Sequence, residues 1–96
     1  MSAQIFVAEA LGTFILVSVI LATGEAVSIG IALAAAIYVA SFASGAHLNC
    51  AVSTVMLFKG RITANHFPVY IAGQLCGAFA ALYWYNMVPQ KSAVHR

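Results

Sequence analysis

The sequence predicts an all-α membrane protein with three transmembrane helices and one re-entrant half-helix. The first observation is composition: 64% of the 96 residues are hydrophobic, 6% are charged and the mean hydropathy is +0.99, which lies outside the usual range of soluble domains. The second is a series of apolar runs at residues 5–22, 29–43 and 67–88, since about 20 apolar residues cross a bilayer. The third is a polar break at residues 44–49. We therefore expect one domain embedded in the cell membrane.

The first apolar run, residues 5–22, is just long enough to cross the membrane and contains a single charge, Glu9. No Lys or Arg precedes the run, and Glu9 interrupts it, so we expect a retained helix rather than a signal peptide. The carboxylate of Glu9 either reaches toward the interface near the helix N-terminus or has a functional role, and the residue alone leaves both open. Ala8 and Gly12, four positions apart, indicate a smooth face for close helix packing.

The break at residues 44–49 predicts a re-entrant segment. Gly45 permits backbone conformations closed to other residues, and Asn49 is a favoured N-cap for a helix that starts at Cys50. The apolar run that follows, residues 50–58, reaches only about half-way across a hydrocarbon core about 30 Å thick. Non-helical backbone is tolerated at that depth only where it is buried in protein or lines a water-filled cavity. We therefore expect the carbonyl groups of the break to face a cavity, close to the positive end of the half-helix dipole.

The last long run, residues 67–88, also contains small and polar residues. Pro68 suits the first turn of a helix, and Gly73 and Gly77 indicate a second face for close helix contact. Gln74 lies beside them and is expected to hydrogen-bond across helices. Beyond this helix we expect a polar, disordered tail at residues 89–96.

Charge and cysteine usage exclude several classes of function. The chain has four basic residues and a net charge of +2, whereas nucleic-acid binding needs clustered Lys and Arg. Cys50 and Cys76 show no metal-ligand or disulfide spacing, and we expect Cys76 to be a buried thiol. The sequence contains no acid/base pair, phosphate-binding loop or metal cluster. We therefore expect neither an enzyme nor a metal, a cofactor or a nucleic-acid partner.

A nine-residue motif in the break, residues 44–52, reads Ser-Gly-Ala-His-Leu-Asn-Cys-Ala-Val. It resembles the first signature of the major intrinsic protein family, the aquaporins and glycerol facilitators, where the pattern is Ser-Gly-Ala/Gly-His-x-Asn-Pro-Ala-Val. Residues 8–14, Ala-Glu-Ala-Leu-Gly-Thr-Phe, resemble the first helix of that family, and residues 73–78, Gly-Gln-Leu-Cys-Gly-Ala, resemble its third. The three matches follow the order of the family and span nearly the whole chain. The resemblance implies half of an aquaporin-like inverted-repeat fold.

The resemblance also implies roles for individual residues. The implied pore positions are Asn49, His47, Gly45, Ala46, Leu48 and Ile29, the implied loop supports are Glu9, Gln74, Cys50, Ala51 and Val52, and the packing glycines are Gly12, Gly73 and Gly77. Asn49 would cap the half-helix with its oxygen and offer its NH₂ group to a solute, and an ordinary N-cap is the alternative. Glu9 would accept hydrogen bonds from the loop backbone.

Two further implied roles also have structural alternatives. His47 would line the mouth of the pore or else pack as an uncharged residue. Ile29 would form an aliphatic wall of the narrow filter, wide enough for glycerol, or else face lipid or the core. Cys50 departs from the family, which has proline there, so the turn is expected to be looser and the thiol reachable.

Family channels join two inverted copies of this unit, and the sequence contains one. We therefore expect a channel subunit for water or small uncharged solutes such as glycerol that must oligomerise, for example as an antiparallel dimer. Lys59 and Arg61 on one side of the membrane balance Lys91 and Arg96 on the other, which permits both orientations. Val52 stands where the family's second signature has arginine, so ion exclusion would depend on the half-helix dipoles. The alternative is a non-conducting truncated paralogue or fragment that interacts with full-length channels.

Overall fold

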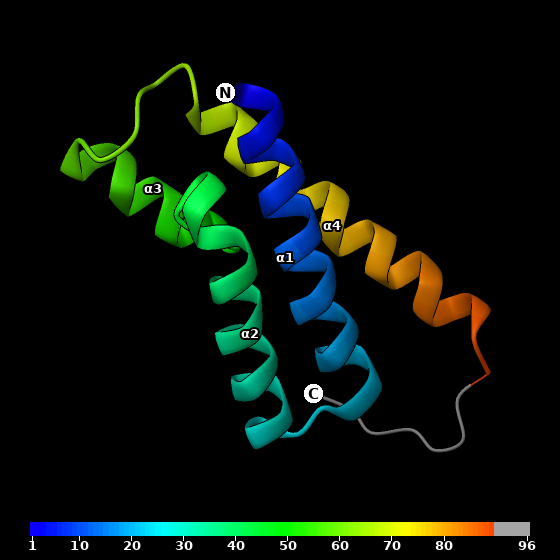
Figure 1. Ribbon diagram of the computed structural model, residues 1–96. Helices are drawn as coiled ribbons and strands as arrows, with labels where there is room; N and C mark the ends of the chain where they lie inside the picture. Colours follow the sequence, from blue (N-terminus) through cyan, green and yellow to red (C-terminus); the bar gives the residue numbers. More distant parts are fainter. Residues whose placement is uncertain (90–96) are drawn as a thin grey trace.

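The computed structural model describes residues 1–89, which form four helices and no strand (Figure 1). The helices are α1 (Ser2–Thr23), α2 (Ala26–Ser44), α3 (Cys50–Lys59) and α4 (Phe67–Met87). Three of them, α1, α2 and α4, are long and apolar enough to cross a membrane. With ten residues α3 is only about 15 Å long, half of a hydrocarbon core. The predicted all-α class with three spans and a shorter helix is confirmed, while the predicted polar tail lies, except for Pro89, outside the described residues.

Helices α1 and α2 extend beyond the apolar runs at residues 5–22 and 29–43, and capping residues lie where they meet. Helix α1 ends at Thr23, and its C-cap Gly24 has a left-handed backbone with φ 59°. Helix α2 then begins at Ala26 rather than at the predicted residue 29, because the carboxylate of Glu25 caps it. That carboxylate accepts hydrogen bonds from the N–H groups of Val27 at 3.1 Å and Ser28 at 2.8 Å. Hydrogen bonding at the caps therefore decides where α1 ends and where α2 begins. The hydropathy of the sequence shows only which part of each helix is apolar.

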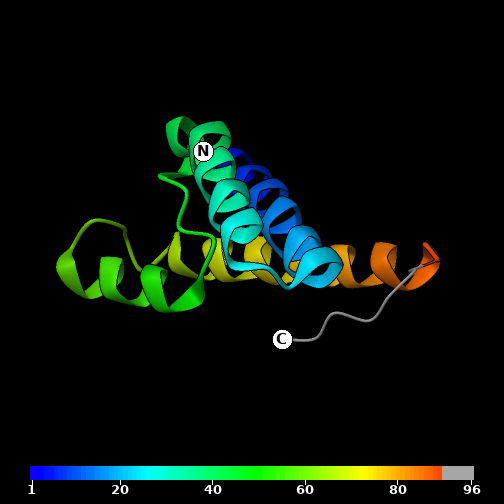
Figure 2. The same cartoon turned by 90° about the horizontal axis from the view of Figure 1, so that it is seen from below.

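Helix α1 lies between α2 and α4 and packs against both, while α3 packs against α4. Seen from below, α1 and α2 lie on one side and α3 and α4 on the other (Figure 2). Gly73 and Gly77 lie where the backbones of α1 and α4 meet: a Cβ at Gly73 would come within 2.8 Å of the Phe6 carbonyl oxygen, and one at Gly77 would collide with the carbonyl of Ala10. Glycine is thus the residue that lets these two backbones touch.

Gly12 has a different neighbour from the one expected. The atoms nearest to a Cβ at Gly12 belong to the side chain of Leu48, at 2.6 Å for the closest. Leu48 belongs to the connection between α2 and α3 rather than to a helix. Gly12 therefore makes room on α1 for the predicted re-entrant segment.

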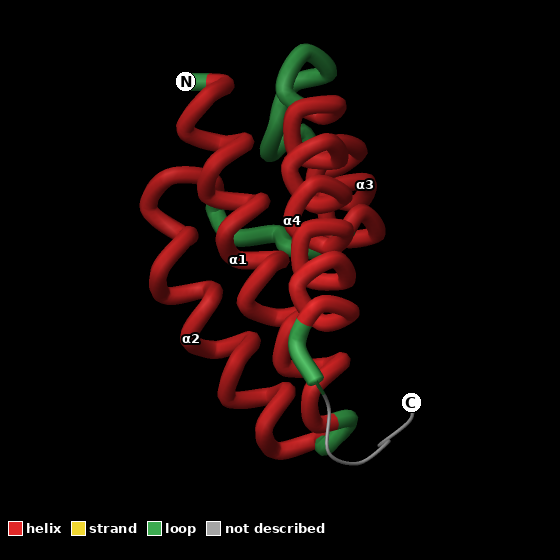
Figure 3. The backbone as a smooth tube through the Cα atoms, turned by 90° about the vertical axis from the view of Figure 1, so that its right-hand side faces the viewer, coloured by secondary structure: helices red, strands yellow, loops and turns green. Residues whose placement is uncertain are grey.

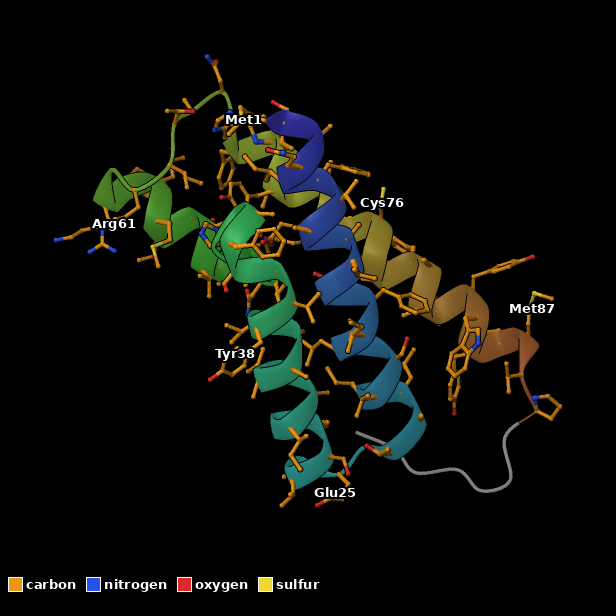
Figure 4. The ribbon with its side chains drawn as sticks, in the orientation of Figure 1. Met1, Glu25, Tyr38, Arg61, Cys76 and Met87 are labelled. Atoms are coloured by element: carbon orange, nitrogen blue, oxygen red, sulfur yellow. The ribbon has the colours of Figure 1, made fainter. Side chains whose placement is uncertain are left out.

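Most buried side chains are small or polar, whereas many large apolar side chains lie on the outside. Side chains at or below 9% exposure include alanines of α2 and five polar residues, namely Glu9, Thr13, Ser44, Ser53 and Gln74. The large side chains of Tyr38 and Phe42 are instead 85% and 90% exposed, and Tyr38 points away from the other helices (Figure 4). This distribution suits a protein surrounded by lipid, where small residues and polar contacts hold helices together. The protein is an integral membrane protein.

Cys76 corrects one prediction. Its thiol is exposed on the outer side of α4 (Figure 4), so the expected buried thiol is wrong. The side of α4 that meets α1 is occupied by Gly73 and Gly77, which turns Cys76 outward.

The chain between α2 and α3 turns back inside the fold. Helix α2 ends at Ser44, residues 45–49 are not helical, and α3 starts at Cys50. Figure 3 shows this connection about half-way along α1, between α2 and α3. From there α3 runs back toward the end of the molecule that holds Met1 (Figure 1). The segment thus has the shape of a re-entrant loop followed by a half-helix, with the N-terminus of α3 near mid-height.

Candidate functional site

The loop at residues 45–49 has an unusual backbone. Gly45, Ala46 and Leu48 have positive φ angles of 82°, 53° and 57°. This conformation costs glycine little, but it costs other residues roughly 1–2 kcal/mol each. Contacts from the surrounding helices must therefore hold Ala46 and Leu48, which are both buried.

The twisted backbone leaves a row of carbonyl oxygens without protein donors. Within residues 1–89, no group donates a hydrogen bond to the carbonyl of Gly45, Ala46, His47 or Leu48. An unpaired carbonyl in lipid is costly, and such groups are found where they meet water or a ligand. The loop therefore presents four successive acceptors.

The carboxylate of Glu9 holds the other side of the loop. Glu9 is fully buried in α1. Its Oε2 accepts hydrogen bonds from the backbone N–H of His47 at 2.9 Å and the hydroxyl of Ser44 at 2.6 Å, and its Oε1 accepts from the backbone N–H of Leu48 at 2.8 Å and the Nε2 of Gln74 at 2.9 Å. All four partners are donors, and a carboxylate has about four acceptor positions. One side chain thus ties the loop to α1, α2 and α4.

A second set of contacts links the loop to α3 and α4. Gln74 also donates from Nε2 to the Oγ of Ser53 at 2.9 Å, and that Oγ lies 2.8 Å from Nδ1 of His47. The imidazole of His47 stacks on the ring of Tyr70, with centroids 4.2 Å apart. The hydroxyl of Tyr70 donates to the carbonyl of Ser44 at 2.5 Å. The ring of His47 is therefore fixed on one face and at one nitrogen.

Asn49 joins the loop to α3. Its Oδ1 accepts a hydrogen bond from the N–H of Ala51 at 2.8 Å, which makes Asn49 the N-cap of α3. Its NH₂ group has no partner within the part of the chain that the structure describes, and the side chain is exposed. Cys50, the first residue of α3, is exposed as well. The N-terminus of α3 therefore carries an exposed amide donor.

A groove of about 330 Å³ brings the loop together with an apolar wall. The loop side consists of residues 46–49 and Val52, and the facing wall consists of Leu16 on α1 and of Leu33 and Ile37 on α2. A larger hollow of about 530 Å³ lies between the outer faces of α1 and α2, but it is almost wholly apolar and includes no residue of the loop. The smaller groove is therefore the candidate site.

Most of the predicted site residues gather around this groove or behind it. Ala46, His47, Leu48, Asn49 and Val52 line it. Glu9 and Gln74 contact the loop from behind, and Ala51 donates to the cap. Gly45 ends α2 and turns the chain into the loop.

Ile29 lies apart from the groove residues. It is half-buried on α2, one helical turn before Leu33 on the same side, and it does not line the groove. Sequence reasoning did not identify the residues that make the wall or those that complete the hydrogen-bond network, namely Leu16, Leu33, Ile37, Ser44, Ser53 and Tyr70. Only Tyr70 has a local signal, since it lies one turn before Gln74 on the inner side of α4.

Comparisons with known proteins find a matching family model and several relatives. The family model described as major intrinsic protein matches residues 22–95. "Glycerol uptake facilitator protein-like 6" of Lactiplantibacillus plantarum is 42% identical over 85 residues, which cover 79% of this chain and 39% of that protein. Human "Aquaporin-9" is 40% identical over 86 residues, which cover 74% of this chain and 29% of that protein.

The matched region is a small share of each relative's length but most of this chain. The chain spans less than half the length of these relatives, and no solved structure is a significant match to it. The family model nevertheless covers more than half of the 96 residues and includes α2, the loop, α3 and α4. The chain therefore belongs to the major intrinsic protein family of membrane channels.

Proposed function

We propose that this chain forms one half of a membrane channel through which water and small uncharged solutes such as glycerol pass down their gradients. The observation that carries the proposal is the groove, which is lined by Ala46, His47 and Leu48, three loop residues with unpaired backbone carbonyls, and by a facing aliphatic wall. A relative named as a glycerol uptake facilitator supports the solute class. The proposed activity is transport, and it needs no chemical step on the solute.

The groove has the chemistry that an uncharged polyol or water requires. Hydroxyl groups of the solute donate to the loop carbonyls, and the NH₂ group of Asn49 donates to a hydroxyl oxygen. The carbon side of a polyol contacts Leu16, Leu33 and Ile37. A solute that enters therefore exchanges its hydrogen bonds with water for hydrogen bonds with the protein.

Cations meet an unfavourable field in the same groove. Helix α3 begins at mid-height, and the aligned peptide dipoles place roughly half a positive charge at its N-terminus. No acidic side chain lines the groove. The half-helix dipole therefore opposes the entry of protons and metal ions while neutral solutes pass.

A second half-repeat completes the proposed pore. The groove is bounded by the loop, α1, α2 and α3 on this side only, since α4 lies behind the loop. A second copy of the chain inserted in the opposite orientation would place another loop against the first, as in inverted-repeat transporters. A full-length channel of the same family is the other partner to consider.

Liposomes that contain the purified 96-residue protein test the proposal. We expect faster osmotic shrinkage and faster glycerol entry than in empty vesicles. Asn49→Asp should slow both because it removes the exposed NH₂ donor and adds a negative charge in the groove. Asn65→Asp is the matched control, because Asn65 is an exposed asparagine in the connection between α3 and α4. Shrinkage equal to that of empty vesicles would reject conduction by this chain alone.

A second measurement tests the antiparallel arrangement. Reporter tags at the C-terminus, read from both sides of the membrane, should show both orientations. A single orientation would exclude the antiparallel dimer. Co-reconstitution with a full-length family channel would then show whether the chain instead binds that channel and alters its flux.

A further inference from the structure

The hydrogen bonds that run from Glu9 to His47 have a defined direction. Oε1 of Glu9 lies 2.9 Å from the side-chain amide of Gln74 and can only accept. The amide must therefore turn its NH₂ group toward Glu9, because its oxygen would face the carboxylate and be repelled. The same nitrogen lies 2.9 Å from the Oγ of Ser53. Both amide hydrogens are thus used, one on Glu9 and one on Ser53.

This direction determines what the hydroxyl of Ser53 can do. Ser53 is fully buried, and its Oγ already accepts a hydrogen from Gln74. Among residues 1–89, the other atom hydrogen-bonded to this Oγ is Nδ1 of His47, at 2.8 Å. If Nδ1 carried a proton, it would donate to Oγ and the Ser53 proton would be left buried without an acceptor. If Nδ1 is unprotonated, it accepts the Ser53 proton, and every donor that runs from Gln74 through Ser53 to His47 is satisfied.

We propose that Ser53 is a positioning residue that fixes His47 as the tautomer with its proton on Nε2. The cost of a buried unpaired donor favours this tautomer over the other by roughly fivefold or more. The stack of the imidazole on Tyr70 holds the ring plane, so Ser53 and Tyr70 together fix both the orientation and the proton position of His47.

The fixed proton gives the groove a second donor. His47 lines the groove and is half-buried, and its Nε2 has no hydrogen-bond partner within the described residues and is not a buried atom. With Nε2 protonated, the side chains of His47 and Asn49 both donate, while the loop carbonyls accept. An arrangement of this kind matches solutes with several hydroxyl groups, each of which donates once and accepts as well. This step rests on the proposed function, whereas the assignment of the tautomer does not.

Ring nitrogens of ¹⁵N-labelled histidine, measured by NMR on the full chain in lipid bilayers at about pH 8, test the assignment without any transport. At that pH an ordinary histidine is neutral. We expect Nδ1 of His47 to be unprotonated and hydrogen-bonded and Nε2 to be protonated, with the His47→Gln variant identifying its signals. A wild-type ring with the proton on Nδ1 would overturn the proposal outright.

Three variants separate positioning from general stability. Ser53→Ala should lower the tautomer ratio by roughly fivefold or more, and Ser53→Thr should restore it because it keeps the hydroxyl. Thr54→Ala is the matched control: Thr54 is the next hydroxyl on α3, and its Oγ1 bonds to the carbonyl of Cys50 rather than to the ring. An unchanged ratio in Ser53→Ala would refute the role of Ser53.

The flux assay keeps the two proposals apart. If the wild-type ring has the predicted tautomer but liposomes show no flux, the proposed function fails and the role of Ser53 stands. If flux is normal and the ring signals do not respond to Ser53→Ala, the role of Ser53 fails alone. Where both hold, we expect Ser53→Ala to reduce glycerol entry and Thr54→Ala to leave it unchanged.

Discussion

The substitution Glu9→Gln tests whether one buried carboxylate holds the re-entrant loop in its twisted conformation. Glutamine keeps the size and shape of the side chain but replaces one of the two acceptor oxygens by an NH₂ group, which only donates. In the native protein both oxygens accept, and each accepts from one backbone N–H of the loop. The substitution therefore removes an acceptor from the loop without creating a cavity.

The magnitude follows from the partners of the two oxygens. If the NH₂ group replaces Oε1, the N–H of Leu48 and the amide of Gln74 lose their acceptor; if it replaces Oε2, the N–H of His47 and the hydroxyl of Ser44 lose theirs. Ser44 and Gln74 can rotate, but the backbone N–H cannot. One loop N–H is left unpaired in either case, at a cost of about 1–3 kcal/mol. That cost corresponds to a roughly 5- to 150-fold larger population of the open loop.

Amide hydrogen exchange in lipid nanodiscs measures this population residue by residue. We expect the N–H of His47 or of Leu48 to exchange roughly 5- to 150-fold faster in Glu9→Gln than in the wild type. Glu25→Gln is the matched control because Glu25 is the only other acidic residue of the chain and caps the far end of α2. It should speed exchange at Ser28 and leave the loop unchanged. Wild-type exchange at both loop amides in Glu9→Gln would show that the Glu9 carboxylate does not hold the loop.

Three further predictions concern the helices. Gly77→Ala should lower the thermal unfolding midpoint, because its Cβ meets the α1 backbone and overpacking costs about 1–3 kcal/mol; Gly30→Ala, with nothing within 4 Å of its Cβ, should not. Hydrogen bonds from the Ser28 hydroxyl and amide hold the pKa of Glu25 below its ordinary value of 4.5, so the cap is complete above about pH 4.5. Protection of the Ser28 amide should therefore fall as the pH drops below that value, and Glu25→Gln should abolish this dependence. Cys50→Pro should raise the unfolding midpoint by the equivalent of about 0.4–1 kcal/mol, and a lower midpoint would contradict a backbone at the start of α3 that accepts proline.

The backbone of the loop explains why its position was predictable from the sequence. A left-handed residue is needed where α2 ends, and Gly45 supplies it; a capping side chain is needed where α3 begins, and Asn49 supplies it. Both needs are local, so both leave a mark on the sequence. Asn49 also has an extended backbone with ψ 126°, the conformation that favours a proline next. Cys50 thus occupies a site that is already shaped for proline, which is why we expect the substitution to be tolerated.

The hydrogen-bond network behind the loop was only partly predictable. Glu9 and Gln74 are conspicuous because polar side chains of their size are costly in lipid unless they are paired. Ser53 is different: a serine in a membrane helix can bond to its own backbone, so its presence alone indicates no partner. Its contacts with His47 and Gln74 depend on how α3 meets α4. Only the packed structure specifies that.

The residues that form the wall of the groove could not be predicted from the sequence, for a related physical reason. In a soluble protein, the apolar side of a helix marks the core, but α2 is apolar on every side because lipid accepts apolar residues as readily as the interior does. Leu33 and Ile37 therefore look the same in the sequence as Ile31 and Val39, which do not line the groove. The useful signal on α2 is size, since its buried positions hold the small residues Ala32, Ala36, Ala40 and Ser44. In a membrane helix of this kind, small residues mark where the protein packs on itself, and the candidate groove lies at the edge of that stripe.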